Sequence, residues 1–317
     1  MLLKLQMFKF IRFLIFFPIL SVSAGSMENA GFEFLRSEIG ARPVSMAGAF
    51  VSIPGDMHGI AYNPASLVGV RDQSIAITYV DHLADFKAGF VGFSKSVPEI
   101  GMFGVSITYM NYGSMQRTDI LGNGLGSFAP GDVLFSGTYG RLFGENLHCG
   151  VSLKFIHSKI DQYVATALAG DLGVIYRIPE KSVDIGFSVL NLGTSLNAFR
   201  DEHEKLPAEY RLGVSNQLAH LPLLINLNLI KYPDQDSNFL GGIYWALGGE
   251  FTLSENLFLR WGYNSRGIEE KVNSSRDRFA GVSLGLGIHY KKYRFNYSFS
   301  SYGLVGTINQ LTFETDL

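Results

Sequence analysis

One pentapeptide in the sequence has the spacing of a catalytic motif. Gly281-Val282-Ser283-Leu284-Gly285 matches the nucleophile elbow, in which a serine hydroxyl attacks the substrate of a hydrolase. The elbow requires a sharp turn between a strand and a helix. Here the pentapeptide lies within an unbroken alternation of apolar and small residues that also places His289 on the same face. The alternation favours small strand residues over a serine hydrolase, so we expect no catalytic residue and no enzyme.

Metal chemistry has one candidate segment. Asp201-Glu202-His203-Glu204 offers ligand types that suit a divalent cation, but we favour a solvated charged loop because the sequence shows no ligand geometry. The mixed-sign run 269–278 is interpreted as another such loop. Cys149 is the single cysteine, which excludes a disulfide framework and a thiolate metal cluster. The sequence contains no HExxH motif and no phosphate-cradling glycine loop. We therefore predict no metal and no cofactor.

The first residues predict export from the cytoplasm. Lys4, Lys9 and Arg12 precede an apolar stretch at 13–20, and small residues follow up to Ala24. This pattern is typical of a secretory signal peptide that is cleaved after Ala24. The formal net charge of −2 and the lack of a long basic run argue against a nucleic-acid partner. The sequence therefore predicts a secreted or outer-membrane protein, which is also unusually poor in charged residues.

The elements that must position these side chains are short alternating strands. Phe103, Val105, Ile107 and Tyr109 alternate with small or hydroxyl residues, so one face of the strand is apolar and the other is not. About fourteen such segments follow one another, and every second link is expected to be longer than its neighbours. The predicted strands are 73–80, 87–97, 100–110, 132–143, 147–159, 165–178, 182–191, 208–218, 222–231, 241–253, 256–264, 278–290, 293–300 and 306–315.

This succession of alternating strands with alternately short and long links predicts a transmembrane antiparallel up-and-down β-barrel in the bacterial outer membrane, surrounded by lipid. A soluble β-sandwich with one wet face is the alternative, but it explains neither the alternating link lengths nor the abundance of aromatics. Charged residues support the barrel because they share the small or polar face, and a charge facing lipid costs about 2–4 kcal/mol at the midplane. The predicted lumen charges are Lys154, Asp171, Arg177, Asp184, Arg211, Glu250, Arg260, Arg294 and Glu314. The tyrosines expected to anchor the barrel at the membrane interface are Tyr163, Tyr176, Tyr232, Tyr263, Tyr290 and Tyr302.

The segment before the first strand differs in character. Residues 25–70 are rich in Gly, Ala and Met and contain several prolines, which suits neither a wall strand nor a solvated tail. We predict that this segment lies inside the barrel as a hatch, with short helical turns at 45–50 and 64–68. The predicted organisation is a signal peptide at 1–24, a hatch at 25–70 and the barrel at 71–317.

Two hatch residues are candidates for a specific role. Arg42 is a charge within an uncharged stretch, and a buried charge requires a partner. It is expected either to pair with Asp171, Asp184 or Glu250 and so latch the hatch, or to face the periplasm without a partner. Asn63 precedes Pro64 and is predicted to cap a helical turn, with a ligand contact as the alternative.

Three short motifs carry a resemblance to a known family. They are Gly40-Ala41-Arg42, Met46-Ala47-Gly48-Ala49-Phe50 and Tyr62-Asn63-Pro64-Ala65-Ser66-Leu67. Their order and spacing resemble the N-terminal signature of the PorV/PorQ group of FadL-like outer-membrane barrels. The stretch from Phe295 to Thr307 is similar to the final hairpin of that family. The chain departs from many outer-membrane barrels because it ends on Leu317 and not on an aromatic residue.

The resemblance implies a barrel of fourteen strands with the N-terminal segment as a hatch, and it leaves two functions open. PorV/PorQ proteins are associated with the type IX secretion machinery, which implies a shuttle or docking component with other secretion proteins as partners. FadL proper passes fatty acids and other hydrophobic molecules, which implies a hatch-gated channel with a small hydrophobic ligand. The charges and glycines of the predicted lumen favour a closely packed hatch, and hence docking, over an apolar tunnel.

Overall fold

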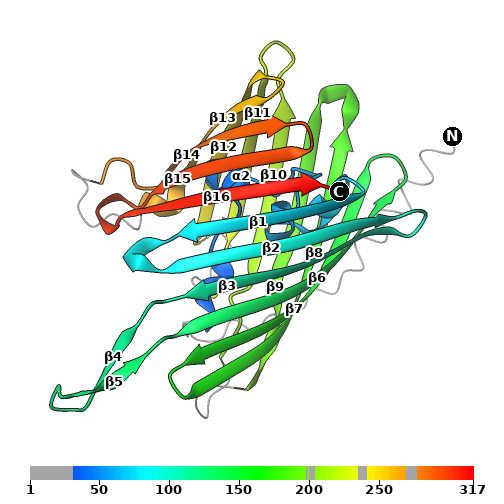
Figure 1. Cartoon of the computed structure of the whole chain (residues 1–317). Helices are drawn as coiled ribbons and strands as arrows, with labels where there is room; N and C mark the ends of the chain where they lie inside the picture. The colour runs from blue at the N-terminus through cyan, green and yellow to red at the C-terminus, as the bar shows by residue number, and fades with distance from the viewer. Residues whose placement is uncertain (1–30, 198, 200–203, 235–240, 269–276) are drawn as a thin grey trace.

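The computed structural model describes residues 31–197, 199, 204–234, 241–268 and 277–317. They form a closed antiparallel β-barrel of fourteen strands and a separate two-stranded hairpin (Figure 1). Consecutive wall strands are neighbours, and β1 closes the barrel against β16, so the predicted up-and-down barrel is confirmed. The wall strands are β1 (Gln73–Asp81), β2 (Lys87–Val97), β3 (Gly101–Asn111), β6 (Gly131–Phe143), β7 (Leu147–Ile160), β8 (Tyr163–Ile178), β9 (Val183–Asn197), β10 (Glu209–Gln217), β11 (Leu223–Lys231), β12 (Ile243–Ser254), β13 (Leu257–Asn264), β14 (Val282–Tyr290), β15 (Tyr293–Ser301) and β16 (Thr307–Asp316).

The outer surface of the barrel is apolar because side chains alternate along every strand. In β2, Ala88 and Phe90 are buried whereas Val91 between Phe90 and Gly92 is exposed. In β7, Leu153 is 74% exposed while its neighbours Ser152 and Lys154 are buried. Exposed Leu, Ile, Val and Phe side chains recur on all the wall strands, and such a surface requires hydrocarbon around it.

The predicted strand ranges each correspond to one wall strand, with three differences. β9 extends to Asn197 and not to 191, and β14 begins at Val282 and not at 278. The link between β7 and β8 was expected to be long, but it is reduced to Asp161-Gln162 because both strands extend beyond their predicted ends. The other links keep the alternation. We call the two ends of the barrel the short-link rim, which holds the C-terminal Leu317, and the long-link rim.

An additional hairpin stands on the long-link rim within the predicted link 111–131. β4 (Met115–Thr118) and β5 (Gly124–Phe128) pair only with each other and project beyond the barrel (Figure 1). The sequence analysis did not predict them, because both strands are short and exposed and β5 contains two glycines. Their polar and apolar residues show no period of two.

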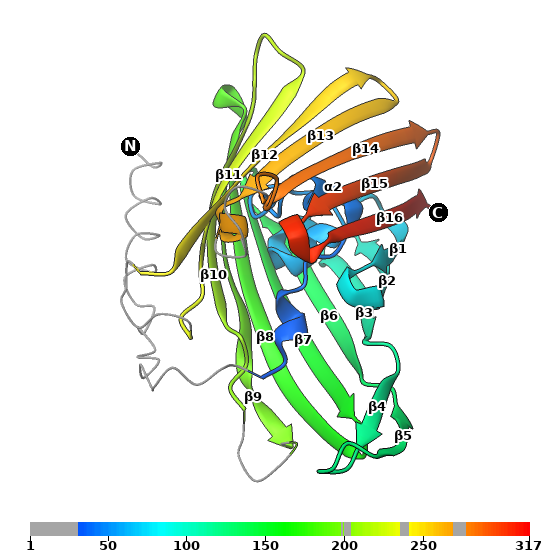
Figure 2. The same ribbon diagram turned by 90° about the vertical axis from the view of Figure 1, so that its left-hand side faces the viewer.

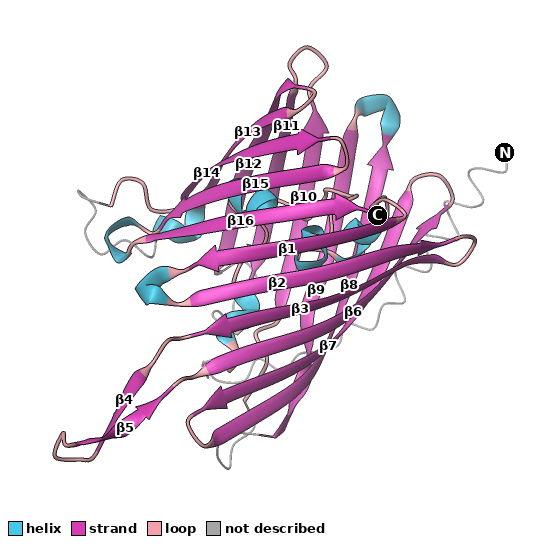
Figure 3. Ribbon diagram, in the orientation of Figure 1, coloured by secondary structure: helices cyan, strands magenta, loops and turns pink. Residues whose placement is uncertain are grey.

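The chain from residue 31 to residue 72 fills the barrel interior as a plug, as expected for the hatch (Figure 2). Its helical turns are η1 (Glu33–Arg36), α2 (Ala41–Ser45), η2 (His58–Ala61) and η3 (Pro64–Leu67). The remaining short turns, η4 (Leu83–Asp85), η5 (Pro179–Lys181), η6 (Ser265–Ile268) and η7 (Gly303–Val305), lie in links between wall strands (Figure 3). No helix among the described residues has the length and apolar composition needed to cross a bilayer.

One of the two expected helical turns is displaced. The turn predicted at 45–50 is instead α2, which starts after Gly40, where the Val44 amide donates to the Gly40 carbonyl. It stops before 50 because Ala47 and Gly48 both adopt positive φ. The second turn, η3, begins at Pro64 as predicted. The predicted cleavage after Ala24 lies outside the described residues, and the 1–24, 25–70 and 71–317 division stays a prediction.

The plug packs against the wall through glycines that face the lumen. A Cβ placed on Gly262 of β13 would lie 2.3 Å from the carbonyl carbon of Met46. A Cβ placed on Gly150 of β7 would lie 2.3 Å from the carbonyl carbon of Pro64. Both distances are far below van der Waals contact, so backbone of the plug lies directly on backbone of the wall. This explains why so many lumen positions are glycine.

Candidate functional site

Arg42 forms the centre of a buried charge network between the plug and the wall. It follows Gly40-Ala41 at the start of α2, where the Ala41 amide donates to Thr312 Oγ1 of β16 (3.0 Å). Its guanidinium donates to both carboxylate oxygens of Glu250 on β12, at 2.8 Å each, and to Asp56 Oδ2 at 3.1 Å. Of the three acids proposed for it, Arg42 contacts Glu250 and not Asp171 or Asp184.

Glu250 also joins the plug to the strand beside it. Arg260 of β13 is its register partner and is completely buried. The Arg260 Nε donates to Glu250 Oε2 at 2.5 Å, and its Nη1 donates to Asn296 Oδ1 of β15 at 2.7 Å. One carboxylate therefore accepts hydrogen bonds from two arginines, which compensates part of the cost of burying all three groups.

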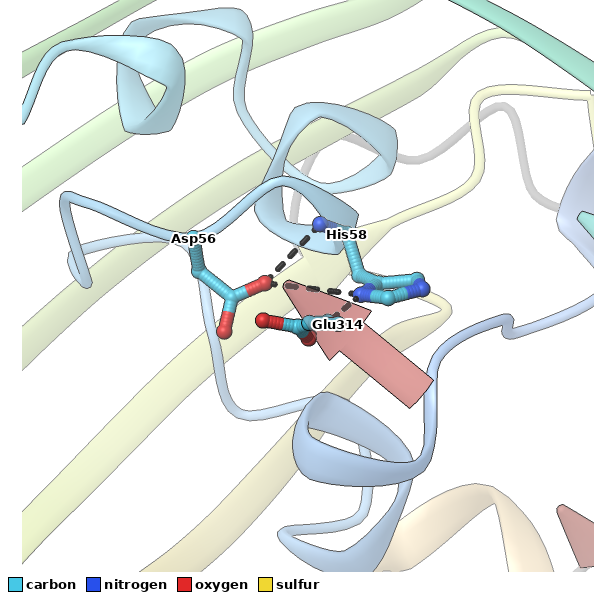
Figure 4. Close-up of side chains that lie close together, drawn as sticks. All are labelled: Asp56, His58 and Glu314. Atoms are coloured by element: carbon cyan, nitrogen blue, oxygen red, sulfur yellow. Dashed lines mark hydrogen bonds and ion pairs between the residues drawn. The ribbon is translucent and has the colours of Figure 1, made fainter. Parts of the chain in front are cut away.

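A second cluster lies beside the first and joins the plug to β16. Asp56 and His58 of the plug meet Glu314 of β16, and all three residues are buried (Figure 4). The His58 Nδ1 lies 3.2 Å from Glu314 Oε1 and 3.7 Å from Asp56 Oδ1, while Nε2 lies 2.8 Å from Thr78 Oγ1. Asp56 Oδ1 also accepts the His58 amide at 2.8 Å, and Arg294 Nε donates to Glu314 Oε2 at 3.0 Å.

The ion pairs shift the pKa values of the plug residues, which lie outside the membrane-spanning strands. Burial alone would lower the pKa of His58, but Asp56 and Glu314 outweigh it and raise the pKa to about 9. Burial would raise the pKa of Asp56, but hydrogen bonding to His58 and the charge of Arg42 hold it well below its usual range. At neutral pH these groups are charged, so each depends on its partner to stay buried.

Asp56, His58 and Glu314 are also of the types that hold a divalent cation. Their nearest donor atoms lie within 4.8 Å of one another. However, Arg42 and Arg294 already bind the outer oxygens of the two carboxylates, so a cation there would face two guanidinium groups. The arrangement suits a histidine between two acids better than it suits a metal ion.

Asn63 both caps η3 and binds the wall. Its Oδ1 accepts the amide of Ala65 at 3.0 Å, which satisfies the first turn as a cap does. Its Nδ2 donates to the Val51 carbonyl of the plug at 2.8 Å and to the Val174 carbonyl of β8 at 3.1 Å. The residue is fully buried, so the alternative of a ligand contact has no support in its surroundings.

Lys154 and Asp171 form a separate ion pair in the opposite wall. The Lys154 Nζ on β7 lies 2.7 Å from Asp171 Oδ2 on β8 and 2.8 Å from Asn191 Oδ1 on β9. The Asn191 amide donates to Asp171 Oδ1 at 2.8 Å. The β8–β9 register shifts between Gly170 and Leu172, and Asn191 has a positive φ of 59°. The pair therefore marks a β-bulge in the barrel wall.

The remaining predicted lumen charges form ion pairs with other residues of the wall. Arg211 of β10 contacts Glu209 of the same strand at 2.7 Å, and its guanidinium lies 5.2 Å from the ring centre of Tyr62 in the plug. Arg177 and Asp184 pair at 3.1 Å across β8 and β9, where the Arg177 side chain is half exposed. The Arg177 pair therefore takes no part in holding the plug.

The lumen is not uniformly polar, which the sequence interpretation did not anticipate. Towards the long-link rim, apolar plug residues meet apolar lumen residues of β1, β2, β3, β6, β7 and β8. We call this the apolar lumen cluster, and its main members are Phe34, Ile60, Val80, Phe90, Met110, Leu134 and Ile156. A cavity of about 50 Å³ remains between the plug and this wall. It is lined by apolar residues such as Phe34, Phe90 and Leu134 and also by the charged residues Arg36, Glu38, Lys154, Glu209 and Arg211.

The outside of the same wall carries an apolar groove of about 1220 Å³. It is lined by Val91, Val105, Phe135, Leu153 and Leu168, among others. Ser106, Ser136 and Lys154 border both the outer groove and the lumen cavity. These three residues thus separate the apolar exterior from a lumen cavity that has both apolar and charged lining residues.

Other sequence candidates have simpler surroundings. Ser283 lies in the continuous strand β14 and its hydroxyl is 2.8 Å from that of Ser300, so it has no elbow geometry. Residues 201–203 and 269–276 lie outside the described residues. Tyr232 was expected to be a membrane anchor, which is wrong. It is buried in the lumen, where the guanidinium groups of Arg36 and Arg266 lie 4.6 Å and 5.4 Å from its ring centre.

The sequence analysis missed several residues of the network between the plug and the wall. They are Asp56 and His58 of the plug and Asn296 and Thr312 of the wall, and none of them has a recognisable spacing from Arg42. The one available signal was that Asp56 and His58 are polar residues within an otherwise small and apolar segment.

The fold has counterparts among solved structures. No family model matches the chain, and no curated protein matches it. The P. putida toluene transporter TodX superposes with a TM-score of 0.59 at 12% identity, covering 88% of this chain and 98% of TodX. The Ralstonia pickettii toluene transporter TbuX gives 0.53 at 13% identity over 88% and 98% of the two chains. A Pseudomonas aeruginosa FadL homologue gives 0.54 at 11% identity over 87% and 98%. The barrel therefore has the fold of FadL-like channels.

Proposed function

We propose that this protein is a plug-gated channel for small hydrophobic molecules in the outer membrane of a diderm bacterium. The observation that carries the proposal is the apolar lumen cluster directly behind the wall that bears the outer groove. A hydrophobic solute is poorly soluble in water, so a protected path from the long-link rim into the bilayer would speed its entry. The long-link rim faces outside, as in other outer-membrane barrels.

The proposed path begins where η1 now lies. Phe34 occupies the apolar lumen cluster, and the cavity left beside it is too small for a solute such as toluene. Passage therefore requires η1 to move away from Phe90 and Leu134. The exit we propose is the wall between Ser106 and Ser136, which are small residues, and the β8–β9 bulge, where the register of the strand ladder shifts.

The structural neighbours favour transport over docking. TodX and TbuX are toluene transporters by description, and each matches nearly the whole barrel. At 12–13% identity they support the fold, and the apolar lumen cluster of this chain supplies the argument for an apolar solute. The sequence interpretation favoured docking because it counted lumen charges. The Arg42–Glu250 and Lys154–Asp171 charges are ion-paired, and an apolar cluster lies beside them in the lumen.

The test is uptake of a radiolabelled monoaromatic hydrocarbon by cells whose own copy is deleted and replaced by variants. Leu134→Asp places a charge in the apolar lumen cluster and is expected to reduce uptake at least tenfold. Ser283→Asp places the same charge on the other side of the lumen, in β14, and is expected to leave uptake unchanged. Equal uptake by the deletion strain and the wild type would contradict the channel.

A docking role of the PorV/PorQ type is the second candidate. The motifs at 40–50 and 62–67 carry it at the sequence level, and the β4–β5 hairpin supplies a structural argument. Ile120 and Leu121 at its tip are almost fully exposed, in a turn fixed by the Asp119 carboxylate and the amides of Leu121 and Asn123. A rigid apolar tip on the outer rim is suited to binding another secretion protein.

Deletion of the gene separates the two functions. Loss of protein secretion with normal hydrocarbon uptake would favour docking, and the reverse would favour the channel. If Ile120→Ser together with Leu121→Ser leaves secretion intact in a strain that otherwise requires the protein, the hairpin is not the docking element.

A further inference from the structure

His58 occupies a position from which it can report whether the plug is seated. We propose that His58 is a proton-linked latch: its imidazolium holds the plug to β16, and release of the plug gives up that proton. The proposal rests on the proposed function only in requiring that the plug moves, and it does not depend on what the channel carries.

The geometry surrounds the imidazole with acceptors. Nδ1 points between Glu314 of β16 and Asp56 of the plug, at 3.2 Å and 3.7 Å. Nε2 lies 2.8 Å from the Thr78 hydroxyl on β1, and the centre of the Phe90 ring of β2 lies 4.8 Å from that of the imidazole, with the two rings tilted by 43°. The side chain is completely buried, so neither ring nitrogen meets bulk water. Nε2 is hydrogen-bonded, whereas Nδ1 lies within ion-pair distance of the carboxylates without an aligned hydrogen bond. The plug can leave β16 only by breaking these contacts.

The charges of the surrounding elements favour a protonated ring. Among the described residues that are at least half-buried, this network contains three arginines and four carboxylates. The arginines are Arg42 of α2, Arg260 of β13 and Arg294 of β15. The carboxylates are Asp56 of the plug, Glu250 of β12, and Glu314 and Asp316 of β16. Arg71 also contacts Asp316, but it is 68% exposed and screened by solvent. One positive charge is missing from the buried set, and the imidazolium supplies it.

Protons have a route to the site. A polar cavity of about 110 Å³ lies next to Glu314 and is lined also by Ser74, Arg294 and Arg71. Arg71 is exposed at the short-link rim, so the cavity lies between the latch and the periplasm. A cavity of this size and polarity suits a few waters. The latch would therefore respond to periplasmic pH.

The linkage gives the direction of the effect. In the seated plug the acidic neighbours raise the pKa of His58 to about 9, whereas an exposed histidine titrates near 6.5. The protonated His58 therefore stabilises the seated plug, fully below pH 6.5, and this contribution to the stability of the seated plug is lost as the pH rises through 9. Between these limits release frees one proton, so the ratio of open to closed plug rises about tenfold per pH unit.

Planar-bilayer recording of the purified full-length protein tests this. We expect the open probability of the wild type to rise with pH between 6.5 and 9, by up to tenfold per unit. His58→Gln keeps a polar group beside Thr78 but cannot be charged, and it should be more open with no such slope. His148→Gln is the matched control, because His148 is a buried lumen histidine that has no carboxylate partner among the described residues and should keep the wild-type slope.

A second measurement covers variants that fail to fold and channels that never open. Nitrogen-15 NMR of histidine-labelled wild type reports the protonation of His58 directly, with the His58→Gln spectrum for assignment or, if that variant does not fold, selective relaxation by a Phe90→Cys spin label. We expect both ring nitrogens to be protonated at pH 7.5. A neutral His58 at that pH, or a pH slope retained by His58→Gln, would overturn the latch. Absence of openings with a protonated His58 would instead count against the channel.

Discussion

At the scale of single residues, the plug is held by charges that cannot be left unpaired. Arg42, Asp56 and Glu250 are each in contact with at least one opposite charge and are largely removed from water. Such a network contributes little to the free energy of folding compared with an apolar core of the same volume. Removal of one partner is nevertheless costly, because it leaves a buried charge without an opposite charge beside it. The residues therefore fix the position of the plug more than they increase the total stability.

The first prediction concerns Arg42. Arg42→Ala removes the arginine partner of Asp56 Oδ2 and one of the two arginine partners of Glu250, so we expect the free energy of unfolding to fall by about 3–5 kcal/mol. Denaturant unfolding in detergent micelles measures the change, and bilayer conductance should show a plug that opens more often. Arg177→Ala is the control, because its pair with Asp184 is half exposed and is expected to contribute less than about 1 kcal/mol. A loss no larger than that of Arg177→Ala would rule out the latch role of Arg42.

At the scale of elements, the plug fits closely against the wall because wall glycines lie where the backbone of the plug touches it. α2 lies against β13 to β16, and η3 lies against β6, β7 and β8. Glycines at the contact points let the two backbones approach, as at Gly262 and Gly150. The plug is therefore positioned by shape on two sides of the barrel, in addition to its ion pairs.

The second prediction concerns this fit. Gly262→Ala would place a methyl group 2.3 Å from the carbonyl carbon of Met46, so α2 or β13 must shift. We expect a loss of about 1–3 kcal/mol and a plug that protease reaches more easily. Gly137→Ala on β6 is the matched control, because its Cβ meets nothing within 4 Å and its effect should be near zero. Equal behaviour of the two variants would show that the close contact is not tight.

At the scale of the whole molecule, the exterior apolar surface requires a membrane, and the interior is divided. The apolar lumen cluster and the outer groove lie on either side of one wall, and the ion pairs that hold the plug, such as Arg42–Glu250, lie on other parts of the lumen. This division allows one barrel to hold the plug firmly and to contain the proposed apolar passage. Neither property alone would distinguish a channel from a docking barrel.

The third prediction concerns the exterior. Leu153→Lys places a charge on the lipid-facing surface in the middle of β7, and we expect folding into lipid vesicles to lose about 2–4 kcal/mol. Leu121→Lys at the hairpin tip adds the same charge to an exposed residue outside the wall and should change stability by less than about 0.5 kcal/mol. Urea-dependent folding into vesicles measures both. A negligible cost at Leu153 would contradict its exposure to hydrocarbon.

Much of the fold was predictable because its signal is local. Each wall strand alternates apolar and small residues over consecutive positions, so neighbouring residues suffice to identify it. The β4–β5 hairpin has no buried face and therefore no alternation to detect. The β7–β8 turn was overestimated because strand ends that extend beyond the membrane lose the apolar pattern.

The candidate site was only partly predictable. A charge within an otherwise uncharged stretch indicated that Arg42 needs an acid, but three acids satisfied that requirement equally well. For His58 the polar residue type was the one signal, and it did not identify the partners, because Thr78 and Glu314 lie on the first and last wall strands. The apolar lumen cluster was also missed, because lumen residues of separate strands become neighbours only when the barrel closes.

The sequence by itself determined that this chain is a transmembrane barrel with an irregular segment before its first strand. That information is carried by residues one or two positions apart, where period-two alternation is visible. The tertiary structure alone decided which charges meet, as Arg42 and Glu250 are 208 positions apart. It also decided that the lumen has an apolar side behind a thin wall. These are properties of strand register and barrel closure, which place distant residues together and leave no trace in local spacing.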